Sequence, residues 1–242
     1  MNLEEVLNYR RSVRVYDPEK AMDSERVKHC VQMATLAPNS SNMQLWEFYH
    51  VCSPELLQQL THASLGQSAV GTASELVIFV TRQDLHRRRA KAVLEFEKGN
   101  IERNSPLDRQ KSRIRDRELY YGWLMPILYT RFFGIIGLFR KLLVSTVGLF
   151  RPMVRQTSEC DVRTVVHKTC ALAAQTFMIA MANEGYDTCP LEGFDHRRVK
   201  KILKLPYGAE VNMIISCGIR KGNEGIWGER FRVPFNEVYH KV

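Results

Sequence analysis

Two arginine clusters lie near opposite ends of this chain of 242 residues and share a side-chain chemistry suited to one ligand. Arginine offers permanently charged donors that can pair with two phosphate oxygens at once, and a small hydroxyl adds a further donor. Together the clusters could bind a phosphate monoester, provided that the fold brings them together. Taken separately, each cluster is more typical of basic residues on a solvated helix or tail. The residues concerned are Arg10, Arg11, Ser12, Arg14, Arg230 and Arg232.

Two further segments lie between these clusters. One runs from Ala37 to Phe48 and the other from Cys189 to Asp195. Read in order, the four segments give Arg-Arg-Ser-x-Arg-x-Tyr, Pro-x-Ser-x-Asn-x-Gln-x-Trp-x-Phe, Cys-Pro-x-Glu-Gly-Phe-Asp and Arg-x-Arg-x-Pro. This order resembles the FMN-dependent nitroreductase family, with a poor match only from about residue 82 to 157. No single segment is specific, but four in the family's order are strong.

The resemblance implies that FMN binds at the interface of a homodimer. It places Arg14 near the N1 and O2 edge of the flavin ring. Reduction puts negative charge on that edge, so a cation there would stabilise the reduced form. The alternative for Arg14 is a surface ion pair, which would contribute little. The flavin phosphate is assigned to Arg10, Arg11, Ser12, Arg230 and Arg232.

Other site residues also follow from the resemblance. One loop matches the segment that the second subunit presents to the flavin, and one turn matches the backbone whose N–H approaches flavin N5. We assign that second role to the backbone of Glu192 and Gly193 rather than to a side chain. Gln67 is a candidate for a ribityl or pyrimidine contact, and Asp195 is interpreted as a helix N-cap. The loop is Pro38, Asn39 and Ser40, and the turn is Pro190, Leu191, Glu192 and Gly193.

The resemblance also implies a reaction. NADH or NADPH would reduce FMN, and a nitro, quinone or related acceptor would then take the electrons by a ping-pong mechanism. Two alternatives remain open: a reductive dehalogenase or flavin-consuming enzyme of the same fold, and a non-catalytic membrane-surface or scaffold protein. The matches at the phosphate site favour the enzyme. One departure is Leu45, where the family usually has proline.

Composition indicates a single globular domain over residues 1–242, because 45% of the residues are hydrophobic and 25% are charged. The six cysteines contain no C-x-x-C pair, so we expect no metal site and interpret nearly all of them as buried, reduced thiols. The first residues lack a basic segment followed by an apolar one, so we expect a cytoplasmic protein rather than a secreted one.

The formal net charge is +9, and much of the excess lies in the basic segment 82–118. Such a charge attracts either small anions or nucleic acid. Between Arg82 and Arg117 the only aromatic residue is Phe96, and no nucleic-acid-binding motif accompanies the charges. We therefore expect an anionic cofactor and no nucleic-acid partner.

An apolar insertion follows at about 119–154. Arg131, the pair Arg140 and Lys141, and Arg151 divide it into pieces too short to cross a bilayer. Two interpretations stay open. The insertion could be a helical lid that folds over the flavin and against the partner subunit, where it would admit a lipophilic small-molecule acceptor. It could instead make a peripheral contact with a membrane.

Hydrophobic periodicity predicts the elements that must position these residues. The order of the elements indicates a layered α+β domain, and the family resemblance implies three layers, α-β-α, around a central and mostly antiparallel sheet. Val162–Glu184, without Gly or Pro and ending before Gly185, predicts a central helix that is apolar nearly all round and hence buried. The other helices are expected at 2–9, 24–37, 53–62 and 195–203, and the strands at 46–52, 76–80 and 211–217. Residues 186–189 are expected to form a short strand or a turn.

Overall fold

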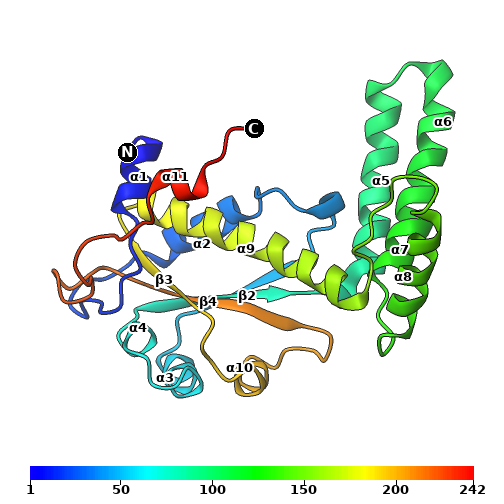
Figure 1. The fold of residues 1–242 in the computed structure, drawn as a ribbon. Coiled ribbons are helices and arrows are strands. Elements are labelled where there is room, and N and C mark those ends of the chain that lie inside the picture. Colours follow the sequence, from blue (N-terminus) through cyan, green and yellow to red (C-terminus); the bar gives the residue numbers. More distant parts are fainter.

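The computed structural model describes residues 1–242 (Figure 1). The helices are α1 (Leu3–Tyr9), α2 (Ser24–Ala34), α3 (Pro54–Ala63), α4 (Ser68–Gly71), α5 (His86–Asn104), α6 (Leu107–Arg117), α7 (Met125–Tyr129), α8 (Ile135–Val147), α9 (Glu159–Asn183), α10 (His196–Ile202) and α11 (Phe235–Val238). Shorter helical segments are η1 (Ser40–Asn42), η2 (Gln83–Leu85) and the π-helical η3 (Glu118–Leu124). The strands are β1 (Trp46–Val51), β2 (Glu75–Thr81), β3 (Asp187–Leu191) and β4 (Glu210–Gly218).

The four strands form one sheet in the order β1-β2-β4-β3, and every neighbouring pair is antiparallel. Helices α2 and α9 cover one face, while α3, α4 and α10 cover the other (Figure 1). The predicted α+β class with a central antiparallel sheet is confirmed. Strand β2 is buried along its whole length, as its continuous apolar run indicated.

Alternate residues of β2 supply the two cores on either side of the sheet. Val77 and Phe79 pack with Phe177 beneath α9, and Leu76 and Ile78 pack under α3 and α10. Side chains of a strand alternate between the two faces, so one apolar run can supply both cores. This explains why β2 has no polar residue from Leu76 to Val80.

Several helix starts lie where capping residues predicted them. Asn2 forms a capping box with Glu5, and the side chains of Asp23 and Asp195 accept hydrogen bonds from the first turns of α2 and α10. Strand β3 continues through Leu191, so the expected turn after Cys189 begins two residues later. The thiol prediction was partly wrong, because Cys52 and Cys160 are exposed.

The prediction that α9 is buried nearly all round is wrong. Buried residues such as Ala173 and Phe177 face the sheet, but Arg163, Lys168 and Leu172 face solvent. The polar residues are spaced at helical intervals, so they form a stripe that the overall apolar composition masked. This is also the one helix in the chain that is long and apolar enough to span a bilayer, yet half of its apolar window is buried in the protein.

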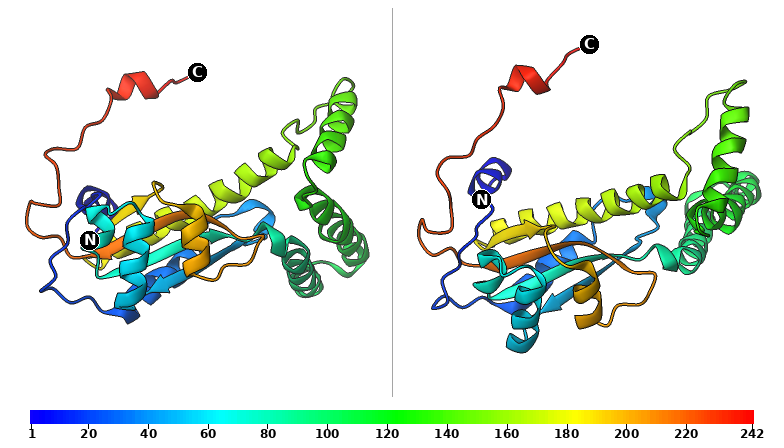
Figure 2. Two further views of the ribbon diagram at one scale, coloured as in Figure 1. Left: turned by 90° about the horizontal axis from the view of Figure 1, so that it is seen from below. Right: turned by 60° about the horizontal axis from the view of Figure 1, so that its bottom comes forward.

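Residues from α5 to α8 form an arm that projects beyond one end of the sheet (Figures 1 and 2). Its base is fixed by a third apolar cluster in which Met125 and Tyr129 of α7 pack with Leu45 and with Val162 of α9. The basic segment therefore belongs to the same projecting unit as the apolar insertion. Met125 and Tyr129 of the insertion are thus core residues, whereas others, such as Trp123 and Phe133, are exposed.

Candidate functional site

The structure brings the two arginine clusters together, as a shared phosphate site requires. They surround a cavity of about 270 Å³ whose lining side chains are mostly cationic. Larger hollows occur elsewhere, including one of about 640 Å³ at the base of the arm, but none has a comparable set of anion donors. The lining residues are Arg10, Arg11, Ser12, Arg14, Trp227, Arg230, Phe231 and Arg232.

Pairing with β3 positions the N-terminal cluster. Ser12 forms an isolated parallel bridge with Thr188, and the Val13 amide donates to the Thr188 carbonyl at 3.2 Å. The Val13 side chain is fully buried, whereas Ser12 and Arg14 on either side are not. Extended backbone sends alternate side chains to opposite sides, so burial of Val13 turns its neighbours toward the cavity.

A buried ion pair fixes the backbone on both sides of that segment. Arg220, just after β4, pairs with Asp187, the first residue of β3, whose carboxylate is only 1% exposed. The Arg220 guanidinium also donates to the Tyr9 carbonyl at 3.2 Å and lies 4.5 Å from the centre of the Tyr9 ring. Hydrogen bonding to Asp187 raises the pKa of Arg220. Both partners of this buried charge pair are thus held where α1, β3 and β4 meet.

Arg230 closes the cavity from the C-terminal side. Its guanidinium donates to the carbonyls of Leu7 and Asn8 at 3.0 and 3.1 Å, and also to that of Arg10. Carbonyls at the end of a helix lack partners within the helix, so a cation is favourable there. Part of the hydrogen-bonding capacity of Arg230 is therefore used to hold the two ends of the chain together.

The cavity carries uncompensated positive charge. None of its five arginines has a carboxylate within ion-pairing distance. Burial, reinforced by the charges of Arg10, Arg232 and Arg11, lowers the pKa of Arg230. Like charges held this close repel one another unless an anion binds between them. The arrangement is therefore suited to a group with two negative charges.

The predicted turn, residues 190–193, begins within β3 and continues beyond its end. The Cys189 thiol is buried, and burial raises its pKa although Arg14 beside it acts in the opposite direction. Pro190 is half-buried and Leu191 is buried, whereas Glu192 and Gly193 are exposed at the strand's end. Gln67 donates to the Gly193 carbonyl at 2.6 Å. The structure thus places the predicted turn and Gln67 together.

The predicted loop of Pro38, Asn39 and Ser40 does not join this group within one chain. It precedes Trp46, which pairs with Thr81 at one end of the sheet, whereas Thr188 pairs with Cys217 at the other end. Within one chain, the loop and the arginine cavity are therefore separated by the length of the sheet.

Tyrosines from the arm hold this loop in place, and sequence reasoning did not identify them. The Tyr120 and Ser41 hydroxyls are 2.8 Å apart, the Tyr121 hydroxyl donates to the Ser41 carbonyl at 3.1 Å, and the Tyr129 hydroxyl donates to Ser40 Oγ at 3.2 Å. Their aromatic character was visible in the sequence, but it was interpreted only as apolar content. Trp227 and Phe231 of the cavity wall were missed as well, although both lie within three residues of Arg230.

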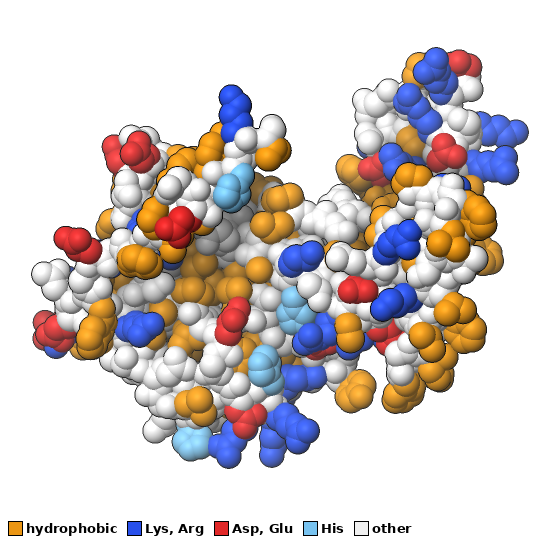
Figure 3. All heavy atoms as spheres, in the orientation of Figure 1, with side chains coloured by type: hydrophobic (Ala, Val, Ile, Leu, Met, Phe, Trp, Pro, Cys, Tyr) orange, Lys and Arg blue, Asp and Glu red, His pale blue; other side chains and the backbone are white.

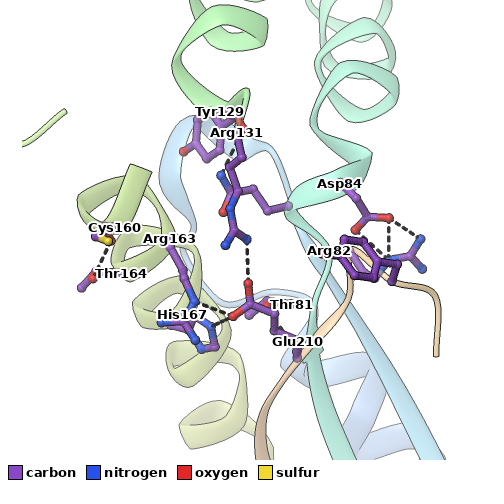
Figure 4. A network of polar contacts seen from close by, with 12 residues as sticks. Thr81, Arg82, Asp84, Tyr129, Arg131, Cys160, Arg163, Thr164, His167 and Glu210 are labelled. Atoms are coloured by element: carbon purple, nitrogen blue, oxygen red, sulfur yellow. Dashed lines mark hydrogen bonds and ion pairs between the residues drawn. The ribbon is translucent and has the colours of Figure 1, made fainter. Parts of the chain in front are cut away.

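A polar network connects the arm to the sheet (Figure 4). Glu210 at the start of β4 accepts from Arg131 of the arm at 2.6 Å, from Arg163 of α9 and from His167 at 3.3 Å. The hydrogen bond from His167, together with those from Arg131 and Arg163, holds the pKa of Glu210 well below its usual range. The arm is therefore attached by an anion that stays charged at neutral pH.

This network predicts an acid-sensitive attachment. Glu210 has a lower pKa in the folded than in the unfolded protein, so its stabilisation is complete at neutral pH and is lost as the pH falls below about 4.3. Thermal unfolding measured from neutral pH down to a pH of about 2 should therefore show a difference in Tm between wild type and Glu210→Gln that stays constant to about pH 5 and narrows below it. The exposed Glu224→Gln is the matched control. A gap of constant size would contradict the prediction.

One group of side chains could offer ligands to a metal, although the sequence indicated no such site. His50, Cys52 and Glu75 bring a nitrogen, a sulfur and an oxygen within 4.8 Å of one another. The Glu75 carboxylate already accepts from His50 at 2.7 Å and from Ser24. The group lies toward the β1 edge of the sheet, two strands away from the arginine cavity, so it plays no part in that site.

Comparisons with known proteins identify the family and the fold of this chain. The sequence model of the nitroreductase family matches residues 7–219. Protein DrgA of Synechocystis is 24% identical over 220 residues, covering 91% of this chain and 85% of DrgA. Putative NAD(P)H nitroreductase MhqN of Bacillus subtilis is 22% identical over 237 residues, covering 96% and 95%. The solved structure of a putative nitroreductase from Exiguobacterium sibiricum in complex with FMN, 19% identical, superposes with a TM-score of 0.69 and covers 100% of this chain and 98% of that one.

Proposed function

Because the chain belongs to the nitroreductase family, we propose that it is an FMN-dependent oxidoreductase that passes hydride from NADH or NADPH to a nitro, quinone or related acceptor. The observation that carries the proposal is the arginine cavity beside β3. A surface that merely kept the protein soluble would not need five arginines gathered around a serine hydroxyl without one carboxylate.

The residues present fit the phosphate of FMN. The dianion would meet Arg10, Arg11 and Arg232, whose guanidinium groups have no acidic partner, and the Ser12 hydroxyl. Arg230 would contribute charge while it continues to hold the backbone of α1. Binding an anion here relieves repulsion among the arginines, so affinity for the phosphate is built into the folded protein.

The flavin ring fits along the end of β3. From Thr188 to Gly193 an extended chain spans roughly 16 Å, the scale of a mononucleotide. Arg14 and the backbone of Glu192 and Gly193 lie along this path. A side chain added at Gly193 would meet only Gln67 Nε2, at 3.5 Å, so the chain's own packing does not require glycine there. Close approach of a flat ring would require it.

Bound FMN would supply the redox chemistry, accepting hydride from the nicotinamide and passing electrons to the second substrate. The chain's own task is to position and to stabilise charge. Arg14 would neutralise the negative charge that develops at the pyrimidine edge, and the amides at Glu192 and Gly193 would orient the ring. No side chain here is required as an acid or base, which accords with the exposed position of Glu192.

The direct test is the spectrum and turnover of purified protein. We expect a yellow protein that binds FMN, oxidises NADH or NADPH, and reduces a quinone or nitroarene. Protein that quenches the fluorescence of neither FMN nor FAD would rule out the enzyme. Binding without turnover on any acceptor would favour the scaffold interpretation.

We also propose that the functional unit is a homodimer. The loop at Pro38–Ser40 and the arginine cavity lie at opposite ends of the sheet, so a loop can reach a flavin only from a second copy. The C-terminal segment supports the idea, because it leaves the body of the protein and ends in α11 without packing on it (Figure 2). Leu3, Met33 and Leu172, on α1, α2 and α9, are large apolar residues that are also exposed in the single chain.

The dimer proposal predicts that FMN-loaded protein sediments as a dimer at micromolar concentration, and that monomer and apo-protein are unstable together. Truncation after Val233, which removes α11, should raise the dimer dissociation constant. Truncation after His240 is the control, because the last two residues lie beyond α11. A monomeric, FMN-saturated species would overturn the proposal.

We propose a lipophilic acceptor for the site so formed. Segments η3 and α7 pack on the Ser40–Ser41 loop through tyrosines, so in a dimer they would lie beside the partner's flavin. Trp123, Leu124 and Ile127 of these segments are at least 50% exposed and would line the acceptor pocket. Trp123→Ser should therefore lower the preference for long-tailed over short-tailed quinones several-fold in kcat/KM. Leu107→Ser, at the exposed start of α6, is the control, and an unchanged preference would contradict the prediction.

A further inference from the structure

Helix α8 presents an apolar face to solvent. Leu138, Phe139, Leu142 and Leu143, here called the α8 face, are each at least 65% exposed. They lie on one side of the helix, because residues three or four positions apart are neighbours on a helix surface. A helix on the surface of a water-soluble protein normally turns polar residues outward. Apolar residues continue beyond both ends of α8, at Phe133, Leu149 and Phe150.

The opposite side of α8 fixes its orientation. A Cβ at Gly137 would come within 2.6 Å of the Glu159 amide, so glycine permits a close approach to α9. Arg140 is buried and donates to the Ile127 carbonyl at 2.8 Å and the Thr130 carbonyl at 3.3 Å, which satisfies the end of α7. Val144 is buried on the same side. The helix therefore cannot rotate to bury the α8 face without breaking these contacts.

The charged residues around the α8 face are all positive. Between Glu118 and Glu159 there is no acidic residue, and Lys141, Arg151 and Arg155 are exposed without a carboxylate partner. Residues 86–155 hold 16 of the 35 Lys and Arg and 6 of the 26 Asp and Glu. Residues 86–155 thus carry a formal +10 and the rest of the chain −1. Figure 3 shows hydrophobic side chains gathered over α7 and α8 and basic ones toward the tip of the arm.

We propose that the α8 face binds the surface of an anionic lipid bilayer, with its leucines and phenylalanines inserted among the acyl chains and the surrounding cations on the headgroups. Such a surface supplies an apolar phase for the leucines and phenylalanines and negative charge for the surrounding cations. Neither group has a partner within the protein. A second copy fits less well, because pairing two such faces would oppose two strongly basic arms. The flavin cover uses η3 and α7, so it leaves α8 free.

The experiment is co-sedimentation of the FMN-loaded protein with vesicles of phosphatidylcholine alone and of phosphatidylcholine with phosphatidylglycerol. We expect binding at least about tenfold stronger to the anionic vesicles, falling as salt is raised to about 1 M. Leu142→Ser with Leu143→Ser should lower the partition coefficient at least about tenfold. The control pair is Leu36→Ser with Tyr207→Ser, which removes two exposed apolar side chains outside the arm. The contribution of charge is tested with the double variant Lys141→Glu and Arg151→Glu, which should also bind anionic vesicles more weakly. The double variant Arg197→Glu and Lys201→Glu, outside the arm, is its control.

A second measurement does not depend on the loss-of-binding variants. Lipids brominated on the acyl chain should quench the tryptophan fluorescence at position 139 of the Phe139→Trp variant. They should quench it more strongly than the fluorescence of the native tryptophans. Equal binding to both vesicle types, no effect of the leucine pair, or no extra quenching would each overturn the proposal. So would loss of a dimer in vesicle-free solution when the leucines are replaced, because α8 would then be a protein contact. FMN content and NAD(P)H oxidation of the same variants report separately on the proposed enzyme.

Discussion

Arg232→Ala is expected to weaken FMN binding by about tenfold or more while leaving the stability of the apo-protein nearly unchanged. A hydrogen bond to a charged group contributes roughly 1.5 to 3 kcal/mol, and about 1.4 kcal/mol corresponds to a factor of ten. Arg232 lines the cavity, and its only hydrogen bond within the protein goes from Nη1 to the carbonyl of its neighbour Phe231, at 2.7 Å. Its guanidinium is therefore free to bind an anion.

The measurement is a titration of apo-protein with FMN, with unfolding curves in parallel. Arg197→Ala on α10 removes an exposed arginine outside the cavity and should leave the dissociation constant unchanged. Arg230→Ala should differ from both, because it loses backbone hydrogen bonds to α1 and so lowers stability as well as affinity. Unchanged affinity in Arg232→Ala would remove this arginine from the site.

Arg220→Ala is expected to destabilise the protein by roughly 3 to 5 kcal/mol. Removing one partner of a buried ion pair leaves the other as an uncompensated buried charge, which is the reason for so large an effect. Here the remaining charge would be Asp187, 1% exposed, with the Arg220 backbone amide as a donor at 2.7 Å. The contact with Tyr9 would be lost too, so the Ser12 segment should loosen and FMN affinity should fall.

Denaturant unfolding of Arg220→Ala, Asp187→Ala and the double variant measures this coupling. The double variant should be destabilised by less than the sum of the single ones, because it removes both charges. Lys28→Ala breaks an exposed pair with Glu25 at 2.9 Å and should cost at most about 1 kcal/mol. Additive single effects would show that the two side chains are not coupled.

The sequence alone determined the family, the α+β class and most local elements. Capping by Asn2, Asp23 and Asp195 depends on residues three positions apart at most, and the apolar run of β2 is continuous. Such signals are short-range, so they can be read without a fold. The four ordered motifs likewise predicted the nitroreductase family, which the match to residues 7–219 confirms. The prediction for α9 was wrong because the average composition of the whole helix is apolar, which hid the polar residues on its exposed face.

Only the tertiary structure decided which residues meet. The bridge from Ser12 to Thr188 and the pairing of Arg220 with Asp187 join segments far apart in the chain, and nothing local to either partner specifies the other. The structure likewise separates the Pro38–Ser40 loop from the arginine cavity by the length of the sheet. Sequence analysis recognised residues 119–154 as apolar, but the packing of Gly137 and Arg140 decides that α8 turns its leucines outward. Hydrophobic content is a property of the chain, whereas the direction in which it faces depends on contacts that only folding creates.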